Sequence, residues 1–140
     1  MIIDTEAQKQ ILTCIAKAEK TTSGELRVHL EANCKKAPVD RAIEVFHQLQ
    51  MQQTEQRNGV LIYLAHQDKK FAIIGDKGID ALVPSNFWDS VRDVMQAHFQ
   101  KNEITEGLCA GITLAAEKLA LYFPWQANDQ NELPDQISFG

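Results

Sequence analysis

Four acidic side chains in this 140-residue sequence could converge as ligands of one metal ion. They are Glu25, Asp76, Asp80 and Asp89. Hard cations such as Ca²⁺ and Mg²⁺ prefer several oxygen ligands, which are carboxylates, backbone carbonyls and water. Gly75 and Gly78 flank the Asp-Lys pair, and glycines permit the sharp backbone turn that would bring carbonyl oxygens together. These residues predict a site for Ca²⁺ or Mg²⁺.

The same acids also have structural interpretations, which the sequence leaves open. Asp76 could cap a short turn, and Asp89 could stabilise a helix N-terminus through the helix dipole. Glu25 could form a surface ion pair with Lys77. Only the arrangement of the acids in space can separate these interpretations from a metal site.

Two basic residues next to the acidic segment, Arg57 and Lys77, could hold a phosphate group. Phosphoryl transfer needs neutralisation of the phosphate charge and a positioned water or nucleophile. Asp76 could serve as a metal ligand or as that nucleophile. The sequence contains no P-loop, no DxDx(T/V) motif and no paired-histidine metal motif, so it identifies no complete catalytic set. Metal-dependent phosphatase activity is one hypothesis, and a non-catalytic interaction module acting through the acidic edge or the C-terminal tail is the alternative.

Other residues that could do chemistry favour structural roles. Glu31, His66 and Asp68 form a second predicted cluster at the opposite end of the strands. Histidines without a spaced partner, including His29, are usually structural or solvent-facing. Trp88 follows another aromatic residue and predicts packing rather than a stacking platform.

The three cysteines, Cys14, Cys34 and Cys109, lie far apart and show no CxxC spacing. Neither a zinc site nor a disulfide framework follows from this pattern. We therefore expect free thiols in a reducing compartment.

The composition excludes several classes of partner. The chain is 44% hydrophobic and 24% charged, with a net charge of −5 and scattered Lys and Arg residues. Nucleic-acid binding requires a basic patch, which is not evident. The N-terminal segment lacks the features of a signal peptide, and no apolar run approaches the ~20 residues of a membrane helix. We expect a cytoplasmic protein without a membrane segment.

Apolar periodicity predicts the elements that would position the site. Apolar residues at helical spacing predict a helix over residues 3–20, and strict alternation over 25–31 predicts a strand with one polar or solvated face. A second helix is predicted behind Pro38. Residues 60–65 and 71–74 are continuous apolar runs separated by a short polar break, which predicts an antiparallel hairpin.

The helix between the first two strands permits a parallel, right-handed connection. The predicted fold is a three-layer α/β/α sandwich with a central mixed β-sheet, made of a parallel βαβ unit plus an antiparallel hairpin. In this topology the starts of the first two strands and the end of the third share one edge. Glu25, Arg57 and Asp76 would therefore lie close together.

Two more helices are predicted, one starting near Pro84 and one capped by Asn102. The second carries Gly107, Gly111 and Ala115 at intervals of four residues, which indicates close approach to the sheet or to a neighbouring helix.

The chain is expected to form a single domain over residues 1–123, followed by a tail at 124–140. The tail is polar and carries isolated apolar residues. It could pack against the domain or bind a protein partner.

Four segments carry a family resemblance: TSGELRV, RNGVLIYLAHQDKKFAIIGDKGI, FWD and EGLCAGI. They resemble the TPM domain, named for thylakoid-lumen, photosystem-repair and receptor-modulator members, over most of the chain before the tail. The resemblance implies an α/β sandwich with a mixed sheet, binding of a divalent cation and, as for some plant members, acid phosphatase activity. Many members carry a signal peptide and a membrane segment, whereas this chain resembles a shorter, soluble bacterial-type subgroup ending in LPDxISFG. Asp80 keeps the family's acidic pattern, but residues 83–85 stand where many members carry another acid.

Overall fold

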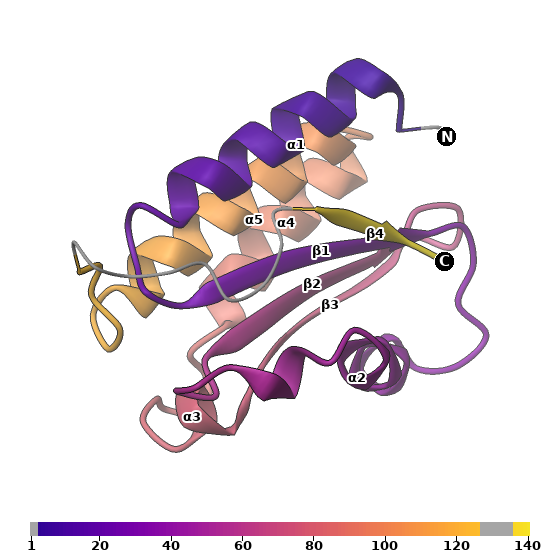
Figure 1. The fold of residues 1–140 in the computed structure, drawn as a ribbon. Coiled ribbons are helices and arrows are strands. Elements are labelled where there is room, and N and C mark those ends of the chain that lie inside the picture. Colours follow the sequence, from indigo (N-terminus) through magenta and orange to yellow (C-terminus); the bar gives the residue numbers. More distant parts are fainter. Residues whose placement is uncertain (1–2, 127–135) are drawn as a thin grey trace.

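The computed structural model describes residues 3–126 and 136–140, which include a four-stranded mixed sheet (Figure 1). The strands are β1 (Glu25–Glu31), β2 (Gly59–Ala65), β3 (Lys70–Gly75) and β4 (Ile137–Phe139), in the order β3-β2-β1-β4. β1 is parallel to β2 and to β4, and β3 is antiparallel to β2. The predicted parallel unit and hairpin are confirmed, and β4 adds a strand that the sequence did not predict.

Helices cover both faces of this sheet (Figure 1). α1 (Thr5–Ala18), α4 (Asp89–Gln100) and α5 (Ile104–Leu119) lie on one face, while α2 (Pro38–Gln48) and the 3₁₀ turn η1 (Met51–Gln53) lie on the other. The short helix α3 (Lys77–Asp80) follows β3 directly. The predicted three-layer α/β/α sandwich is therefore confirmed.

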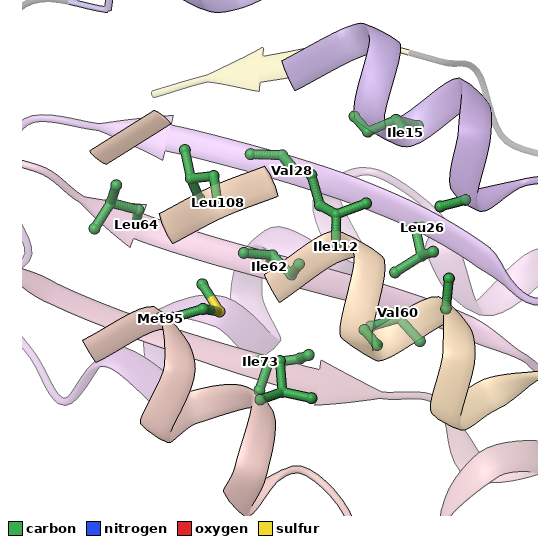
Figure 2. Close-up of a cluster of buried hydrophobic side chains, with 14 of the residues drawn as sticks. Ile15, Leu26, Val28, Val60, Ile62, Leu64, Ile73, Met95, Leu108 and Ile112 are labelled. Carbon is green, nitrogen blue, oxygen red and sulfur yellow. The ribbon is translucent and has the colours of Figure 1, made fainter. Parts of the chain in front are cut away.

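The larger core lies between the sheet and the three-helix layer (Figure 2). Val28, Ile62 and Ile73 point from three strands toward Met95 and Ile112 of the helices (Figure 2). Full burial of an Ile or Met side chain stabilises the fold by about 1.5–3 kcal/mol. This layer fixes the sheet on which the candidate site is built.

The polar face of β1 is buried rather than solvated, contrary to one of the alternatives the alternation allowed. Glu25, Arg27, His29 and Glu31 are all less than one-tenth exposed. This face is covered by neighbouring elements, since Glu31 contacts Arg41 of α2 and His29 contacts Ser138 of β4. Charged side chains at these positions must therefore find partners within the protein.

The close approach predicted from small residues is between α5 and α4. A Cβ atom at Gly107 would lie 2.6 Å from a ring carbon of Phe99, and one at Gly111 would lie 2.5 Å from Sδ of Met95. Asn102 does not cap α5 as predicted. It has a left-handed backbone (φ 60°), and Glu103 is the N-cap.

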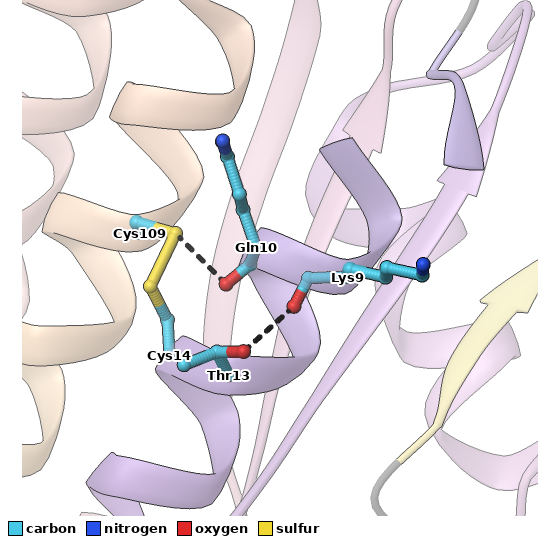
Figure 3. The surroundings of a disulfide bond; sticks show 5 residues. All are labelled: Lys9, Gln10, Thr13, Cys14 and Cys109. Carbon is cyan, nitrogen blue, oxygen red and sulfur yellow. Dashed lines mark hydrogen bonds between the residues drawn. A yellow bond between two sulfur atoms is a disulfide. The ribbon is translucent and has the colours of Figure 1, made fainter. Parts of the chain in front are cut away.

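The expectation of three free thiols is wrong for two of the cysteines. Cys14 of α1 and Cys109 of α5 form a disulfide bond, with their Cα atoms 5.6 Å apart (Figure 3). The sequence could not reveal this pair because 95 residues separate the two positions, and only the packing of α1 against α5 brings them together. Cys34 is a free, buried thiol, as expected.

The predicted tail is attached to the domain at both of its described ends. Pro124 forms an isolated β-bridge with Thr22, and β4 pairs with β1. Residues 127–135 of this tail lie outside the described residues. Within the described part of the chain, no helix has both the length and the apolar character needed to cross a bilayer.

Candidate functional site

Strand register brings the predicted site residues to one edge of the sheet. Glu25 is opposite Gly59, and Val60 is opposite Gly75, so β1 and β2 begin where β3 ends. The amide of Glu25 donates to the Asn58 carbonyl (3.1 Å), and the amide of Asp76 donates to the Gly59 carbonyl (2.9 Å). The predicted placement of Glu25, Arg57 and Asp76 at one edge of the sheet is confirmed, and their roles in a site remain a prediction.

A pocket of about 450 Å³ opens at this edge, between α2, the end of β3 and α3. Its polar lining contains Arg57, Asp76, Lys77 and Asp80. Its remaining walls are mostly apolar and come from Val39, Ile43, Phe46, His47, Ile73, Ile74, Gly75 and Trp88. This volume lies within the range of about 300–1,000 Å³ that is usual for small-molecule sites.

Arg57 and Asp76 form a bidentate ion pair inside the pocket lining. Arg57 Nε donates to Oδ2 of Asp76 at 2.8 Å, and its Nη2 donates to Oδ1 at 2.9 Å. The hydrogen bond to Asp76 raises the pKa of Arg57, so the guanidinium stays charged. The Asp76 side chain is almost fully buried, whereas that of Arg57 is 40% exposed and can still contact a ligand.

Asp76 also begins α3. Its Oδ1 accepts from the backbone N–H of Lys77 at 2.7 Å, which is the capping role that the sequence left open. The carboxylate thereby fixes the direction of α3 and the position of Asp80, whose amide donates to the Asp76 carbonyl (3.1 Å).

The glycines of this loop serve close packing rather than the unusual turn that we predicted. The described glycines include none with a positive φ, so neither Gly75 nor Gly78 adopts a conformation reserved for glycine. A Cβ atom at Gly78 would instead overlap the carbonyl oxygens of Gln56 and Arg57. The absence of a side chain lets α3 lie against the segment that carries Arg57.

Asp80 is the second carboxylate in the pocket. Partial burial raises its pKa first, and repulsion from Asp76 raises it further. A bound cation would relieve the repulsion that Asp80 experiences from Asp76.

The other two predicted ligands lie outside the pocket lining. Asp89 sits in the first turn of α4, is more than half exposed and forms an ion pair with Arg92. Glu25 is buried at the start of β1. Among residues 3–126 and 136–140, no group of three or more His, Cys, Asp or Glu side chains is arranged to hold a metal ion.

The pocket therefore fits a cation only in part. A carboxylate offers about four acceptor positions, and Asp76 uses three of them on Arg57 and the Lys77 amide. Asp76 and Asp80 could together supply a small number of protein oxygens, with the other ligands coming from water or from a bound anion. Mg²⁺ is often held in this way, by one or two carboxylates and a substrate phosphate.

The pocket wall formed by α2 was not predicted from the sequence. The buried residues of α2 are Ala42, Val45 and Phe46, and these side chains pack in the core. Val39 and Ile43 lie on a separate line of the same helix and are 50% and 44% exposed. An apolar pair four residues apart, outside the core stripe, was the available signal for this wall.

Trp88, interpreted as a packing residue, is buried and stacks edge-on against Phe87 with ring centroids 4.7 Å apart. It also lines the pocket. Its indole N–H has no hydrogen-bond partner among the described residues. Trp88 therefore packs against Phe87 and also forms part of the pocket wall.

At the opposite end of β1, Glu31 of the predicted second cluster is held by internal bonds, while Asp68 of that cluster bonds Asn33 and the Cys34 amide instead. Glu31 accepts two hydrogen bonds from Arg41, each 3.0 Å long, and further bonds from Tyr63 and from His29. His29 also contacts Ser138 of β4 through Nδ1 at 2.7 Å. This cluster holds elements together, in agreement with the structural interpretation of His29.

The chain is similar to one known domain family and to solved structures of the same fold. The TPM domain matches residues 1–118. The NMR structure of BA42 protein from the psychrophilic bacterium Bizionia argentinensis is 47% identical, has a TM-score of 0.94, and is aligned over 100% of this chain and 97% of that chain. The N-terminal domain of a P. gingivalis protein, also solved by NMR, shares the fold at 19% identity, with a TM-score of 0.68 and coverage of 90% and 83%. No curated protein matches the chain.

The match to the TPM domain spans most of the sequence, and the likeness to BA42 extends over the whole of it. Both agree with the resemblance carried by the segments around β1, the β2–β3 hairpin and α5. The chain belongs to the TPM domain family.

Proposed function

We propose that this TPM domain binds a divalent cation, Ca²⁺ or Mg²⁺, together with a phosphate group in the pocket at the end of β3. Asp80 and Asp76 are the proposed protein ligands of the cation. Arg57 and Lys77 are the proposed contacts of the phosphate. The observation that carries this proposal is that two carboxylates and two basic side chains line the same pocket.

The chemistry of the pocket supports a phosphate ester with an apolar group. Arg57 presents a charged guanidinium that is already oriented by Asp76, and an oriented guanidinium suits phosphate oxygens. The apolar wall formed by Val39, Ile43 and Trp88 could accommodate the rest of the molecule. Such a pocket would favour an ester of an apolar alcohol over inorganic phosphate.

Hydrolysis of that ester is the activity that this arrangement would support. A bound cation supplies charge neutralisation and lowers the pKa of a coordinated water. Arg57 and Lys77 would orient the phosphate, and the apolar wall would limit access of bulk water. We assign no nucleophile, because both oxygens of Asp76 already accept hydrogen bonds.

The alternative function, a protein-interaction module acting through the tail, has less support. Residues 137–139 pair with β1 within the same chain, so this part of the tail is not presented as a free segment. The acidic edge does not form one continuous patch either, because Asp76 is buried in its ion pair. A cytoplasmic location remains our proposal. The Cys14–Cys109 disulfide would be unusual in that reducing compartment.

A metal titration followed by NMR tests the cation site. Ca²⁺ and Mg²⁺ are expected to shift amide resonances between Gly75 and Asp80. Asp80→Asn should weaken binding by about 10- to 100-fold, the loss usually seen even when only a supporting residue of a metal site is changed. Asp89→Asn is the matched control, since it removes an acid of the original prediction that lies outside the pocket lining. Unmoved resonances at millimolar metal, or equal effects of the two variants, would remove the proposed site.

The phosphate site is tested separately by hydrolysis of p-nitrophenyl phosphate with and without metal. Lys77→Gln should raise KM, because the side chain is exposed while its capping amide is retained. Asp80→Asn should reduce the metal-dependent rate, and Asp89→Asn should not. Wild-type and Asp80→Asn proteins with the same rate would show that the activity does not come from this pocket.

A further inference from the structure

The disulfide between α1 and α5 lies in a cavity that shares no lining residue with the proposed phosphate pocket. Cys14 is in the second half of α1, and Cys109 is near the N-terminal end of α5 (Figure 3). Neither residue lines the pocket at the end of β3. The function of this bond must therefore be sought in its own surroundings.

The bond lies at a groove on the protein surface. Cys14 and Cys109 are both half-buried and line a groove of about 380 Å³ between the two helices. Glu6, Lys9 and Glu106 give this groove charged walls of both signs. Its size is that of a small-molecule site, so a small thiol can reach the sulfur atoms without unfolding of the helices.

The two helices are held together independently of the sulfur atoms. Ile11 and Ile15 of α1 and Ile112 and Ala115 of α5 are fully buried in the main core. In the reduced protein the thiol of Cys109 would have an acceptor, since its Sγ lies 3.6 Å from the carbonyl oxygen of Gln10 (Figure 3). Thiols are weak donors whose Sγ contacts are long. Both the reduced and the oxidised pair are thus compatible with the fold.

The third cysteine has the opposite environment. Cys34 is 3% exposed, and its thiol donates to the Lys36 carbonyl at 3.1 Å. Buried structural cysteines react slowly, whereas exposed ones exchange readily. Cys34 can therefore serve as an unreactive control cysteine within the same chain.

We propose that Cys14 and Cys109 form a reversible thiol–disulfide exchange site for small thiols of the glutathione class, approached through the groove between α1 and α5. Oxidation crosslinks the two helices, and reduction releases them within an intact fold. Cys34 takes no part in the exchange.

The exchange balances with glutathione as the only co-reactant. One protein thiolate attacks a sulfur of oxidised glutathione, forms a mixed disulfide and expels one glutathione thiolate. The second protein thiolate attacks the protein sulfur of that mixed disulfide and expels the other glutathione thiolate. Two protein thiols are oxidised to one disulfide, and one molecule of oxidised glutathione is reduced to two of glutathione, which take up the two protons.

The test uses the full chain, equilibrated in glutathione buffers of increasing oxidised fraction, then alkylated and analysed by peptide mass spectrometry. Cys14 and Cys109 should lose alkylation together as the buffer becomes oxidising and should regain it when reduced glutathione is restored. Cys34 should remain unreactive in the folded protein throughout. Circular dichroism of the reduced protein should show an unchanged helix content.

Three variants sharpen the result. Cys14→Ser and Cys109→Ser should each retain one glutathione on the remaining cysteine, while Cys34→Ser should behave as the wild type. Failure to form the disulfide at any buffer ratio would overturn the proposal. So would a disulfide that reduced glutathione cleaves only after denaturant is added, because the bond would then be a permanent crosslink. Equal reactivity of Cys34 would contradict a selective site.

Discussion

Glu31 shows how a buried charge can be held in this domain. Burial raises the pKa of Glu31, but the hydrogen bonds from Arg41, Tyr63 and His29 outweigh burial and lower it to about 2. The carboxylate is therefore ionised at neutral pH although it is 8% exposed. Since Arg41 lies on α2 and Tyr63 on β2, this one side chain joins three elements.

Replacing Glu31 with Gln should destabilise the protein by about 2–3 kcal/mol at pH 7, because Arg41 and the Tyr63 hydroxyl would lose their charged acceptor. The folded pKa of Glu31 lies below its ordinary value of 4.5, so its contribution is present above pH 4.5 and disappears as the pH falls toward about 2. Denaturant unfolding between pH 7 and 2 should show a smaller pH dependence in Glu31→Gln than in the wild type.

Glu44→Gln is a suitable control for this prediction. Glu44 also pairs with Arg41, at 3.3 Å, but its side chain is 42% exposed. Exposed ion pairs contribute little to stability. Equal losses in the two variants would show that burial of Glu31 is not the cause.

At the same scale, the candidate site was predictable only for residues at strand ends. Strand direction placed Glu25, Arg57 and Asp76 at one edge, but it could not tell which side chains line a pocket. Asp89 was chosen because the first turn of the third predicted helix was expected to bring it to this edge, yet it forms an ion pair with Arg92 within α4. The α2 wall was missed because its contribution depends on how far the helix lies from β3, which periodicity does not determine.

At the scale of elements, the packing of α4 on α5 depends on a line of small residues. Gly107→Ala should improve the intrinsic helix propensity of α5 by up to about 1 kcal/mol. The new Cβ would press on the Phe99 ring, which is held against Phe71 with centroids 5.1 Å apart. Overpacking of this kind usually destabilises by about 1–3 kcal/mol. We expect thermal unfolding to show a net loss of stability.

Thr113→Ala provides the comparison, since Thr113 is exposed on the same helix. It should be neutral or stabilising by a few tenths of a kcal/mol, because only helix propensity changes. A Gly107→Ala variant more stable than the wild type would mean that α4 can move away from α5 without a loss of stability.

The end of β4 is fixed by another glycine. The amide of Gly140 donates to the Leu30 carbonyl at 3.0 Å, and a Cβ at this position would overlap Glu31 and lie 2.8 Å from Nε2 of His29. Gly140→Ala should speed hydrogen exchange of the amide at position 140 by about fivefold or more, given a penalty of at least about 1 kcal/mol. Phe139→Ala, at a position that is 57% exposed, should have a smaller effect. Unchanged exchange in Gly140→Ala would show that the contact is not tight.

The elements with long apolar patterns were predicted, although α4 begins at Asp89 rather than near Pro84, and the short elements were missed. α3 has four residues and β4 has three, too few for any periodicity. Their existence depends on distant partners: Asp76 begins α3 beside Arg57, and β4 forms only along a β1 edge already built from residues about 110 positions earlier in the chain.

At the scale of the whole molecule, the two polar ends of the sheet have different roles. The end that includes Asp76 and Asp80 opens into a pocket, while the end that includes Glu31 and His29 is closed by β4. Burial lowers the pKa of His29 most strongly, so the folded state favours the neutral ring. Stability from this histidine is present above its ordinary pKa of 6.5 and is lost as the pH falls below it.

Mild acid should therefore weaken the His29 end before Glu31 is protonated. Hydrogen exchange measured at pH 7 and at pH 5, and corrected for the intrinsic exchange rate at each pH, should show lower protection factors for β4 amides at the lower pH, and His29→Gln should reduce that difference. Equal protection of β4 at the two pH values would contradict the prediction.

The position of β4 has a consequence for how this family is delimited. The matched region stops at residue 118, but the sheet is completed by residues 137–139. In a recombinant protein trimmed at that boundary, β1 would still pair with β2, but its backbone groups that face β4 would lose their partners and could pair with the same strand of another molecule. Such a fragment would be prone to aggregate during expression, and its insolubility would reflect a missing strand rather than a misfolded domain.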